Sequence, residues 1–526
     1  MYRNMPFEPT APIFVINQHK GKIDTQSIYI YIYTTLNTNM TDSSSYSASE
    51  SDCDTISDSD LDSDVVILTD DDLTDACPTI YELTHEYVQN HVLGMHEPTF
   101  HECMEDDIAN LLYSEWKHAG LCSENQKEYI KNHCELICND YFNLQGAIAP
   151  RRSRPTTAGI PKERYKTILA ELMSIEQPEQ RTPEWYEFRH DLISASSLGK
   201  IFGTDASRNR LIYEKCQSFD SSKGHGAISV SSPMHWGQKY EPVSCALYEH
   251  MFSTKVSEFG CIRHRDHPFI GASPDGIITK PGCSRYGRML EIKNIVNREI
   301  TGIPLKDYWI QMQMQMECCD LDECDFLETQ FKEYDDESEF LEDNTHSHKG
   351  VILYFVERVS IGRDSASHPR SNTYPNSEEM ESSGRALAQQ YSGVPHYEYM
   401  PLDIPLDATS VNTWIDQMRT KLRRSWSLYT PIYWYLDQYS CVLVERNRQW
   451  FKEALLLIEN TWKTIEQERE TGCEHRAPAK KSMKVPCLEV VTNVDDGKEL
   501  RNFPLQKGVC LVKLGGDTDE VHSINM

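Results

Sequence analysis

Apolar positions repeat at two different spacings along the chain. In residues 78–148 they recur every three or four positions, as in Ile80, Leu83 and Tyr87, which predicts amphipathic helices. From residue 164 to residue 360, runs with helical spacing alternate with strand-like runs. Such alternation predicts an α/β unit in which helices pack on a sheet.

Composition divides the rest of the chain into segments. Residues 149–163 are basic and contain proline, which predicts a linker, and the Ser/Pro/Asn/Glu-rich residues 361–393 predict a loop insertion. Further on, YSCVLVERN (439–447) predicts a strand and RQWFKEALLLIENTWKTIEQE an amphipathic helix. The predicted segments are a disordered acidic leader (1–77), a helical accessory region (78–148), the linker (149–163), an α/β core (164–360), the insertion (361–393), a closing strand and helix (394–471) and a tail (472–526).

The leader is rich in Ser, Asp and Glu and poor in apolar residues. Burial therefore cannot offset the entropy lost on ordering, and we expect disorder. A short β-prone run lies inside it beside three aspartates, and consists of Val65, Val66, Ile67 and Leu68. The run resembles a SUMO-interacting motif, in which a peptide adds a strand to a partner sheet. Two interpretations stay open: a site for SUMO or a SUMO-modified host protein, and a chance run.

The charge of the chain is very uneven. The formal net charge is −29, which at first argues against a nucleic-acid partner. Residues 41–75 contribute −12 of it and residues 317–343 another −12, so the rest of the chain carries only −5. A local basic groove is therefore compatible with the sequence. The acidic stretch 320–349 looks too polar for a core, and we expect either a flexible insertion or a mimic of a nucleic-acid strand.

The 17 cysteines and the absence of a signal peptide indicate an intracellular protein with reduced thiols. Neither Cys134 and Cys138 nor the group Cys318, Cys319 and Cys324 forms paired C-x-x-C units. We therefore expect buried structural cysteines, with an iron–sulfur site left open. No run of apolar residues approaches the length of a membrane span, so no membrane partner is expected.

Three charged residues form the pattern that carries chemistry. In FIGASPDGII (269–278), the Pro-Asp-Gly turn presents Asp275 at a strand junction. In RMLEIKNI (288–295), Glu291 and Lys293 are two positions apart on a predicted strand, so both point to one face. Two carboxylates can hold Mg²⁺ through oxygen, and the lysine can orient or help deprotonate an attacking water. Taken alone, each motif is also typical of an ordinary turn or an exposed Glu–Lys pair.

Five elements in this order resemble the PD-(D/E)XK nuclease superfamily, in the branch of phage lambda exonuclease and the YqaJ-type viral recombinases. The first is a W-x-x-x-R-x-x-x-I-S-A-S pattern, made by Trp185, Arg189, Ile193, Ser194, Ala195 and Ser196. The others are Glu241 in HWGQKYEP on a predicted helix, Asp275, the Glu291–Lys293 pair, and a Tyr-x-x-Gln-x-Gln helix whose first glutamine is Gln311. The resemblance spans roughly 130 residues and implies a mixed central sheet flanked by helices.

The resemblance also implies a role for each matched residue. Asp275, Glu291 and the backbone carbonyl of Ile292 would bind Mg²⁺, for which Mn²⁺ is expected to substitute, and Glu241 would support a second metal. Lys293 and Gln311 would position the nucleophile. A 5′-terminal phosphate would be bound by Arg189, Ser196 and Ser273, and a guanidinium with two hydroxyls suits a phosphate monoester. Without the resemblance, Arg189 and Ser196 are equally compatible with a helix salt bridge and an N-cap, and Glu241 with a surface position.

We therefore predict a Mg²⁺-dependent exonuclease that resects double-stranded DNA from 5′-phosphorylated ends, in the recombination, repair or genome processing of a large DNA virus inside its host cell. A single-strand annealing protein and further copies of the chain are expected partners. One rival is an endonuclease or RNA-degrading enzyme on the same site. The other is a catalytically idle nucleic-acid-binding adaptor, against which the intact set of Asp275, Glu291 and Lys293 argues.

Overall fold

The computed structural model describes residues 68–145, 150, 162–180, 182–219, 232–358, 395–478, 509–511 and 523–525. Its contacts divide the chain into two units, residues 1–477 and 478–526. In the second unit, β11 (Val509–Leu511) pairs antiparallel with β12 (Ser523–Asn525). Among the described helices, none combines the length and the apolar character that a membrane span requires. The predicted insertion 361–393 and most of the linker and tail lie outside the described residues.

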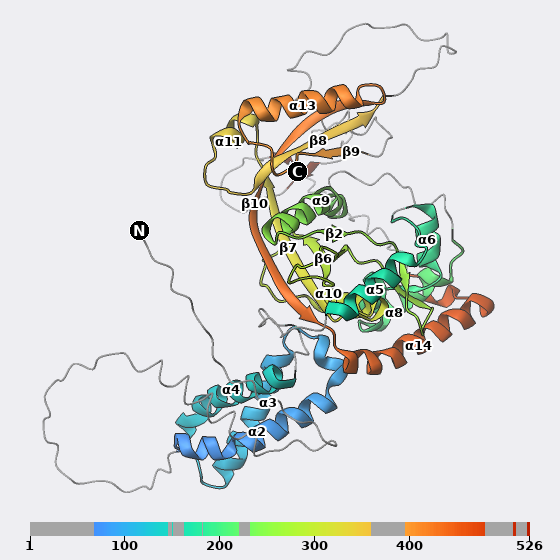
Figure 1. Ribbon diagram of the computed structural model, residues 1–526. Helices are drawn as coiled ribbons and strands as arrows, with labels where there is room; N and C mark the ends of the chain where they lie inside the picture. The colour runs from blue at the N-terminus through green and yellow to red at the C-terminus, as the bar shows by residue number, and fades with distance from the viewer. Residues whose placement is uncertain are drawn as a thin grey trace, which may run out of the picture. The chain divides into compact units, whose positions relative to one another are not determined.

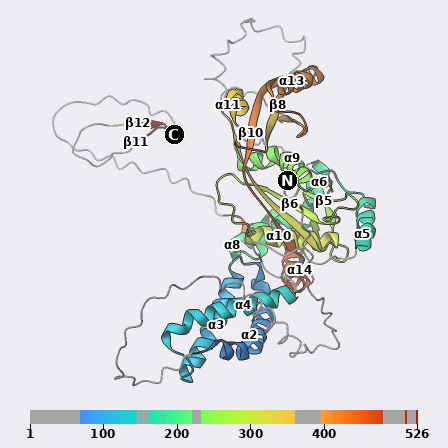
Figure 2. The same ribbon diagram turned by 60° about the vertical axis from the view of Figure 1, so that its left-hand side comes forward.

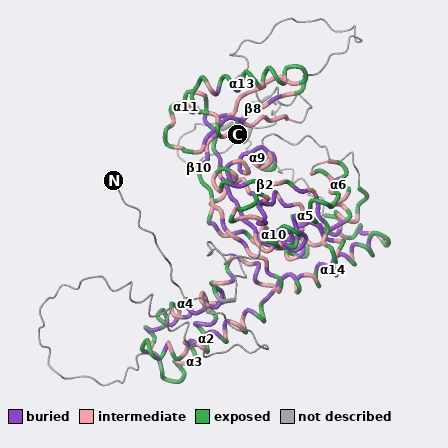
Figure 3. The backbone as a smooth tube through the Cα atoms, in the orientation of Figure 1, coloured by how far each residue is buried: buried purple, intermediate pink, exposed green. Residues whose placement is uncertain are grey.

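Three long helices open the described chain: α2 (Asp70–Asn90), α3 (Phe100–His118) and α4 (Lys127–Gln145), with short 3-10 turns η1 (Val92–His96) and η2 (Glu124–Gln126). They lie side by side in both ribbon views (Figures 1 and 2). Buried and exposed positions alternate along these helices in Figure 3, and the buried ones include the apolar residues Ile80, Ile108 and Ile137. The helical spacing of the sequence therefore correctly indicates a helical accessory region here.

The predicted boundary of the disordered leader at residue 77 is wrong, because α2 begins at Asp70. Thr69 caps this helix: its side chain accepts from the backbone N–H of Asp72, and the Asp72 carboxylate accepts from the N–H of Thr69 at 2.8 Å. Acids in the first turn are favoured there by the helix dipole. Leu68 is buried, whereas Val65, Val66 and Ile67 lie outside the described residues. The acids beside the β-prone run thus belong to the first turn of a capped helix, and the interpretation of the run as a partner site stays a prediction.

A seven-stranded sheet organises the core, in the order β2-β5-β6-β7-β10-β8-β9. Its strands are β2 (Val256–Ser257), β5 (Gly276–Ile278), β6 (Met289–Asn294), β7 (Glu323–Glu333), β8 (Lys349–Glu357), β9 (His396–Tyr399) and β10 (Trp426–Glu445). Only β6 and β7 pair in parallel within this sheet, and α10 (Lys306–Cys319) makes the crossover between them. The α/β class with a mixed central sheet is confirmed.

Two helices cover opposite faces of β6 and β7. On one face, α10 reaches Glu291 through its glutamines. On the other, α9 (Pro233–Met251) packs Tyr248 against Leu290, Ile292 and Leu327. Residues that alternate along one strand therefore enter two different environments. Charged residues of β6 that face α10 therefore lie at the site, and the buried carboxylate of β7 that faces α9 lies in the core.

The strand β10 is longer than the sequence pattern indicates. It runs for 20 residues and is visible in Figure 1 as one continuous strand. Its C-terminal half pairs with β7, and its N-terminal half pairs with β8. The half that pairs with β8, together with β9, α11 (Glu337–Glu342) and α13 (Ala408–Leu422), extends the sheet beyond the core.

The expectation for the acidic stretch 320–349 is wrong, because this stretch supplies the central strand β7 and part of β8. Asp325 and Glu328 of β7 have only 1% of their side chains exposed. Arginines from another part of the chain pair with them: Arg285 and Arg288 with Asp325, and Arg298 with Glu328. Buried carboxylates are tolerated where such cations compensate them. Counting acids alone could not show these partners.

The remaining described elements surround this sheet. A small second sheet has the order β1-β4-β3, from β1 (Ile193–Ser194), β4 (Ile270–Ala272) and β3 (Ile262–Arg263). The other helices are α5 (Lys162–Ser174), α6 (Pro183–His190), α7 (Ala195–Leu198), α8 (Asp205–Cys216) and α14 (Arg448–Thr471), with 3-10 turns η3 (Gly199–Ile201) and η5 (Glu474–Arg476). The helix α5 begins at Lys162, so the predicted linker to residue 163 ends slightly earlier.

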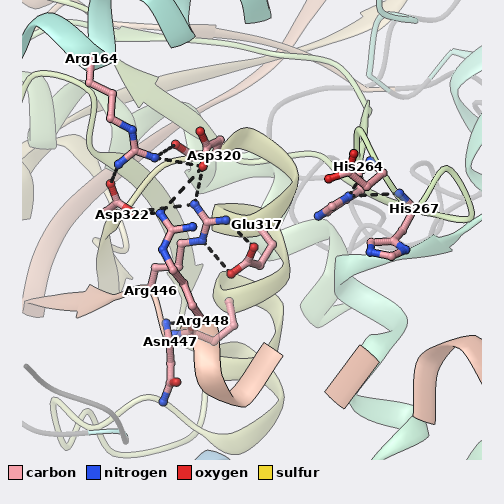
Figure 4. A network of polar contacts seen from close by, with 11 residues as sticks. Arg164, His264, His267, Glu317, Asp320, Asp322, Arg446, Asn447 and Arg448 are labelled. Carbon is pink, nitrogen blue, oxygen red and sulfur yellow. Dashed lines mark hydrogen bonds and ion pairs between the residues drawn. The ribbon is translucent and has the colours of Figure 1, made fainter. Parts of the chain in front are cut away.

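A polar network fixes the C-terminal end of α10 (Figure 4). Arg446, between β10 and α14, donates to Glu317 at 2.7 Å and to Asp320 at 2.7 Å. Arg164 of α5 donates to Asp320 at 3.0 Å, and Arg448 donates to Asp322 at 2.8 Å. These charge-assisted bonds connect the helices α5, α10 and α14 and the segments that precede β7 and α14. They hold in place the helix that carries the glutamines of the site.

Candidate active site

Asp275 lies between β4 and β5, at the strand junction that its Pro-Asp-Gly turn predicts. Its Oδ2 accepts a hydrogen bond of 2.7 Å from the backbone N–H of Ile292. The next residue, Gly276, must be glycine, because an added Cβ would lie 2.1 Å from the Val256 side chain of β2. This close approach of β2 and β5 brings the Asp275 carboxylate against the middle of β6.

Glu291 and Lys293 occupy one face of β6, as their spacing predicts. The Glu291 side chain is fully buried, and the Lys293 Nζ donates to its Oε1. The same ammonium lies 4.8 Å from the centre of the Tyr308 ring. Register with β7 places Glu291 opposite Phe326 in the middle of the sheet. A rigid central strand therefore carries both groups, which fixes their separation.

The glutamines of α10 divide between the site and the core. Gln311 and Gln315 are one helical turn apart, and each donates to a different oxygen of Glu291 at 2.7 Å. Gln313 points away: it donates to the Glu445 carbonyl at 2.9 Å and accepts from the Asn447 N–H at 2.6 Å. The Met residues between them are buried. The expectation that some of this alternating run is core packing is therefore correct.

Glu241 reaches the site from α9, the helix predicted for it. Asn294, at the end of β6, holds this helix in place. Its Nδ2 donates to the Gly237 carbonyl at 3.0 Å, and its Oδ1 accepts from Ser244 at 2.6 Å. The register of α9 against β6 is thus fixed within one turn of Glu241 on either side.

Charge is unbalanced at this point of the molecule. Burial raises the pKa of Asp275 well above its ordinary value, and repulsion from Glu291 and Glu241 raises it further. Burial alone would lower the pKa of Lys293, but Glu291 and Asp275 outweigh it and the pKa rises. Asp275 and Glu291 thus share the ammonium of Lys293, and the Glu241 carboxylate adds negative charge beside Asp275. Carboxylates crowded in this way are stable as anions only if another positive charge joins them.

The three residues assigned to a phosphate are connected through Trp185 of α6. The Arg189 guanidinium lies 4.0 Å from the centre of the Trp185 ring and donates to the Ser196 Oγ at 2.7 Å. The Trp185 indole N–H donates to the Ser273 Oγ at 3.2 Å. No carboxylate of the described residues lies within ion-pair distance of Arg189, so the salt-bridge interpretation does not apply. The guanidinium is oriented but its charge is not compensated.

Lys215 of α8 adds a further positive charge behind Arg189. Its Nζ donates to the Arg189 carbonyl at 2.7 Å and has no ion-pair partner in the part of the chain that is described. Burial, and then the charges of Arg189 and Arg469, lower its pKa to about 8. Nothing in the sequence singled out this residue. It holds the last turn of α6 and makes this end of the site more positive.

A cavity of about 220 Å³ joins these groups. It is lined by Gln180, Trp185, Arg189, Ser194, Ala195, Ser196, Glu241, Ser273, Asp275, Glu291, Ile292, Lys293 and Gln311. The structure thus brings all the predicted chemistry-bearing residues of the core to one place. Sequence reasoning gave no role to Gln180 or Gln315. The position of Gln315, four residues after Gln311, was the available signal, because such residues share a helix face.

The donor set fits a hard divalent cation. In the described part of the chain, no three His, Cys, Asp or Glu side chains are grouped closely enough to hold a metal by themselves. The cavity instead offers Asp275, Glu291, the Ile292 backbone and, across it, Glu241. Oxygen donors of this kind are the ligands of Mg²⁺ and Mn²⁺. The excess of carboxylates over cations is what such an ion would neutralise.

The cysteines take no part in this arrangement. Cys134 and Cys138 are buried in the helical accessory region, and Cys318, Cys319 and Cys324 are buried at the end of α10 and the start of β7. Burial raises the pKa of the Cys134 thiol to about 12. These residues are free thiols that pack in the core, as the sequence indicates.

The core is thus a mixed α/β sheet in which Asp275, just before β5, meets Glu291 and Lys293 of β6. Residues 184–322 match the family model described as a YqaJ-like viral recombinase domain. Over these residues, the resemblance to the YqaJ-type viral recombinases that the sequence motifs indicate is confirmed. The matched residues include every core position to which the resemblance assigned a role.

An uncharacterized protein of Acanthamoeba polyphaga mimivirus is 28% identical over 340 residues, which cover 57% of this chain and 56% of the relative. The chain therefore spans about half the length of the curated relative that it matches. Among solved structures, the alkaline exonuclease LHK-Exo of Laribacter hongkongensis matches with a TM-score of 0.30 and 19% identity, over 55% of this chain and 95% of that chain. The same enzyme in complex with dAMP matches with a TM-score of 0.30 and 21% identity, over the same shares of the two chains.

Proposed function

We propose that this chain is a metal-dependent exonuclease that degrades double-stranded DNA from 5′-phosphorylated ends. The observation that carries the proposal is the single cavity in which a carboxylate-rich end and a guanidinium end face the same space. The YqaJ-like viral recombinase domain supports a role in the processing of viral DNA. The relative from Acanthamoeba polyphaga mimivirus agrees with a viral setting.

The carboxylate-rich end of the cavity suits the phosphodiester that is cleaved, and the Arg189 end suits the terminal phosphate. Asp275, Glu291 and the Ile292 carbonyl would hold Mg²⁺, or Mn²⁺ in its place, with Glu241 supporting a second ion. Such an ion supplies Lewis acidity and lowers the pKa of a bound water. Lys293 offsets phosphate charge and, together with Gln311, orients the nucleophile. Both side chains are held by Glu291, so their donors are fixed before DNA arrives.

The other end would bind the terminal phosphate. Arg189 donates to the hydroxyl of Ser196, which leaves its remaining N–H donors for a phosphate. Ser196, which accepts from Arg189, and Ser273, which accepts from the Trp185 indole N–H, add hydroxyl donors. A phosphate monoester at a DNA end carries more charge than an internal diester. The guanidinium, with Lys215 behind it, therefore favours an end over the middle of a strand.

The direct test is degradation of three matched substrates, with and without Mg²⁺. Linear DNA with a 5′-phosphate should be digested, linear DNA with a 5′-hydroxyl more slowly, and closed circular DNA not at all. Digestion should require the metal and should fail in Asp275→Ala. Cleavage of circular DNA would identify an endonuclease instead, and preference for RNA a ribonuclease. Binding of DNA without any cleavage would leave the adaptor as the correct class.

The end preference has its own variant and a matched control. Arg189→Ala should reduce digestion of 5′-phosphorylated ends by about 10- to 100-fold, which is the value of a hydrogen bond to a charged group. Digestion of 5′-hydroxyl ends should change little. Arg263→Ala is the control, because Arg263 stacks 4.4 Å from the Phe188 ring of the same helix without lining the cavity. Equal rates for both ends in the wild-type protein would reject phosphate recognition.

A further inference from the structure

A second cavity lies at the far end of β10, outside the active site. It has a volume of about 320 Å³ and is called here the distal pocket. Its lining residues are Arg358, Arg419, Thr420, Arg423, Trp426, Ser427 and Leu428. They come from three elements: the end of β8, the last turn of α13 with the residues after it, and the start of β10. The Arg358 backbone N–H donates to the Ser425 carbonyl at 2.9 Å, which joins the end of β8 to the residue before β10.

Positive charge is concentrated in the distal pocket. Arg419 forms an exposed ion pair with Asp416 at 3.4 Å, which contributes little in water. Arg358 and Arg423 have no ion-pair partner among the described residues. The dipole of α13 accounts for basic residues in its own last turn, but not for Arg358 on a different element. Three guanidinium groups that converge in a chain of net charge −29 call for an anionic ligand.

The chemistry of the distal pocket fits a phosphodiester backbone. Guanidinium groups bind phosphate oxygens through paired hydrogen bonds, and the hydroxyls of Thr420 and Ser427 are additional donors. Trp426 offers an aromatic surface and is held by stacking on His396, with ring centres 4.8 Å apart. A row of phosphates on duplex DNA can contact all three arginines, which are largely exposed at the surface.

The strand β10 sets the distance from the distal pocket to the active site. Glu291 lies opposite Phe326 of β7, and Phe326 lies opposite Val442 of β10. Trp426, in the pocket, precedes Val442 by 16 residues on the same strand. At a rise of about 3.3 Å per residue this is up to about 50 Å. Duplex DNA covers that length in about 15 base pairs, at roughly 3.4 Å per base pair.

We propose that the distal pocket binds the backbone of duplex DNA about 15 base pairs from the end that occupies the active site. This inference rests on the proposed function, because it takes the DNA end to lie in the cavity of Asp275 and Glu291. It gives the extension of β8, β9, β10 and α13 a role. The extension holds the incoming duplex while the core acts on its end.

The test compares short and long DNA. Binding of 5′-phosphorylated duplexes of 10 and 30 base pairs is measured by fluorescence anisotropy with the full chain in EDTA, so that no cleavage occurs. The variant is Arg358→Ala with Arg419→Ala and Arg423→Ala. A control variant combines Arg210→Ala, Arg265→Ala and Lys332→Ala, which removes the same charge from exposed positions elsewhere.

The triple arginine variant should bind the 30-base-pair duplex at least about 10-fold more weakly and the 10-base-pair duplex as the wild type does. For the long duplex, the slope of log K against log salt should become shallower by about 2 to 3, because each phosphate that the protein neutralises contributes close to one to this slope. Unchanged binding of the long duplex, an equal loss on the short one, or an equal loss in the control variant would each overturn the proposal. The proposal would also be overturned if a peptide of residues 41–75 bound the protein only when the three arginines were present, while DNA bound equally well without them.

Digestion of the 10-base-pair duplex with Mg²⁺ separates this inference from the proposed function. The triple arginine variant should digest it at the wild-type rate. If the wild type digests no DNA, the proposed nuclease function fails. If digestion is normal and only the length-dependent binding is absent, the distal pocket alone is wrongly assigned.

Discussion

The two faces of the paired strands β6 and β7 both bury charge, but they balance it differently. On the face under α9, Asp325 accepts from Arg285, from Arg288 at 3.0 Å and from the Tyr248 hydroxyl at 2.5 Å. Arg288 also donates to Glu323 at 2.9 Å, so two carboxylates meet two guanidinium groups. On the face under α10, Asp275 and Glu291 share the ammonium of Lys293, and Glu241, which reaches the cavity from α9, adds negative charge beside Asp275.

The difference separates structural charge from functional charge. A buried ion network persists when its charges cancel and its hydrogen bonds are complete, as around Asp325. A group of carboxylates that exceeds its cations costs free energy when no ion is bound and favours any cation that can enter. Charged side chains are buried on both faces, so burial alone does not distinguish the functional site from the structural ion network. The balance of charge, together with access from a cavity, is what marks the site.

The largest expected effect is the loss of cleavage when a carboxylate of the uncompensated face is removed. Asp275→Ala or Glu291→Ala should reduce the rate of DNA digestion by about a thousand-fold or more, or at least ~4 kcal/mol of transition-state stabilisation. The far-UV circular dichroism spectrum should stay that of the wild type. Lys293→Ala should also lose most of the rate but retain metal binding, which calorimetry with Mn²⁺ measures. Near-normal turnover by Asp275→Ala would remove the basis of the assignment.

On the compensated face, a substitution should change stability instead. Asp325→Asn leaves Arg285 and Arg288 without their shared carboxylate, so the free energy of unfolding should fall by about 3–5 kcal/mol. Chemical denaturation measures it. Asp437→Asn is the control: Asp437 pairs with exposed Lys332 at 2.9 Å, and its loss should cost about 1 kcal/mol or less. Equal effects of the two substitutions would mean that the Asp325 network is not the compensated core that its hydrogen bonds indicate.

A third prediction separates two glutamines of one helix. Gln315→Leu removes a buried donor to Glu291 and should slow digestion about 10- to 100-fold, as expected for a residue that orients a metal ligand. Gln313→Leu removes two hydrogen bonds to the backbone before α14 and should lower stability while the rate per folded molecule stays unchanged. Rates measured well below the melting temperature of both variants make the comparison. If Gln313→Leu lost activity to the same degree, the division of α10 into two faces would be wrong.

The smallest effect concerns Lys215, whose pKa is lowered to about 8. Between pH 8 and the ordinary lysine pKa the unfolded chain binds more protons than the folded protein, so this group makes stability rise with pH across that window. Lys215→Met should therefore melt a few degrees higher than the wild type at pH 7, and the gap should narrow above pH 8. The same variant should lose part of its preference for 5′-phosphorylated ends. A melting difference that is independent of pH would show that Lys215 is not a buried cation.

The sequence predicts a contact well when the two interacting residues are close together in the chain, and poorly when they are far apart. Glu291 and Lys293 are two positions apart, so strand periodicity alone places them together. Arg189 and Ser273 are far apart in the sequence, and only the resemblance to a family joined them. The acids of β7 could not be placed correctly from composition, because their arginines lie on other segments. The capping box of Thr69 and Asp72, by contrast, was a local signal that composition concealed.

The most direct test of the account is the melting temperature of the wild type and of Asp275→Asn, each measured in EDTA and in Mn²⁺. The substitution removes one of the three crowded carboxylates and keeps the shape of the side chain. The wild type should melt several degrees higher with Mn²⁺, because an ion at about 100 times its Kd adds about 2.7 kcal/mol. Asp275→Asn should melt at least as high as the wild type in EDTA and should gain nothing from Mn²⁺. A wild type that is indifferent to Mn²⁺, or an Asp275→Asn protein that is less stable in EDTA, would contradict the claim that the excess of carboxylates exists to hold a cation.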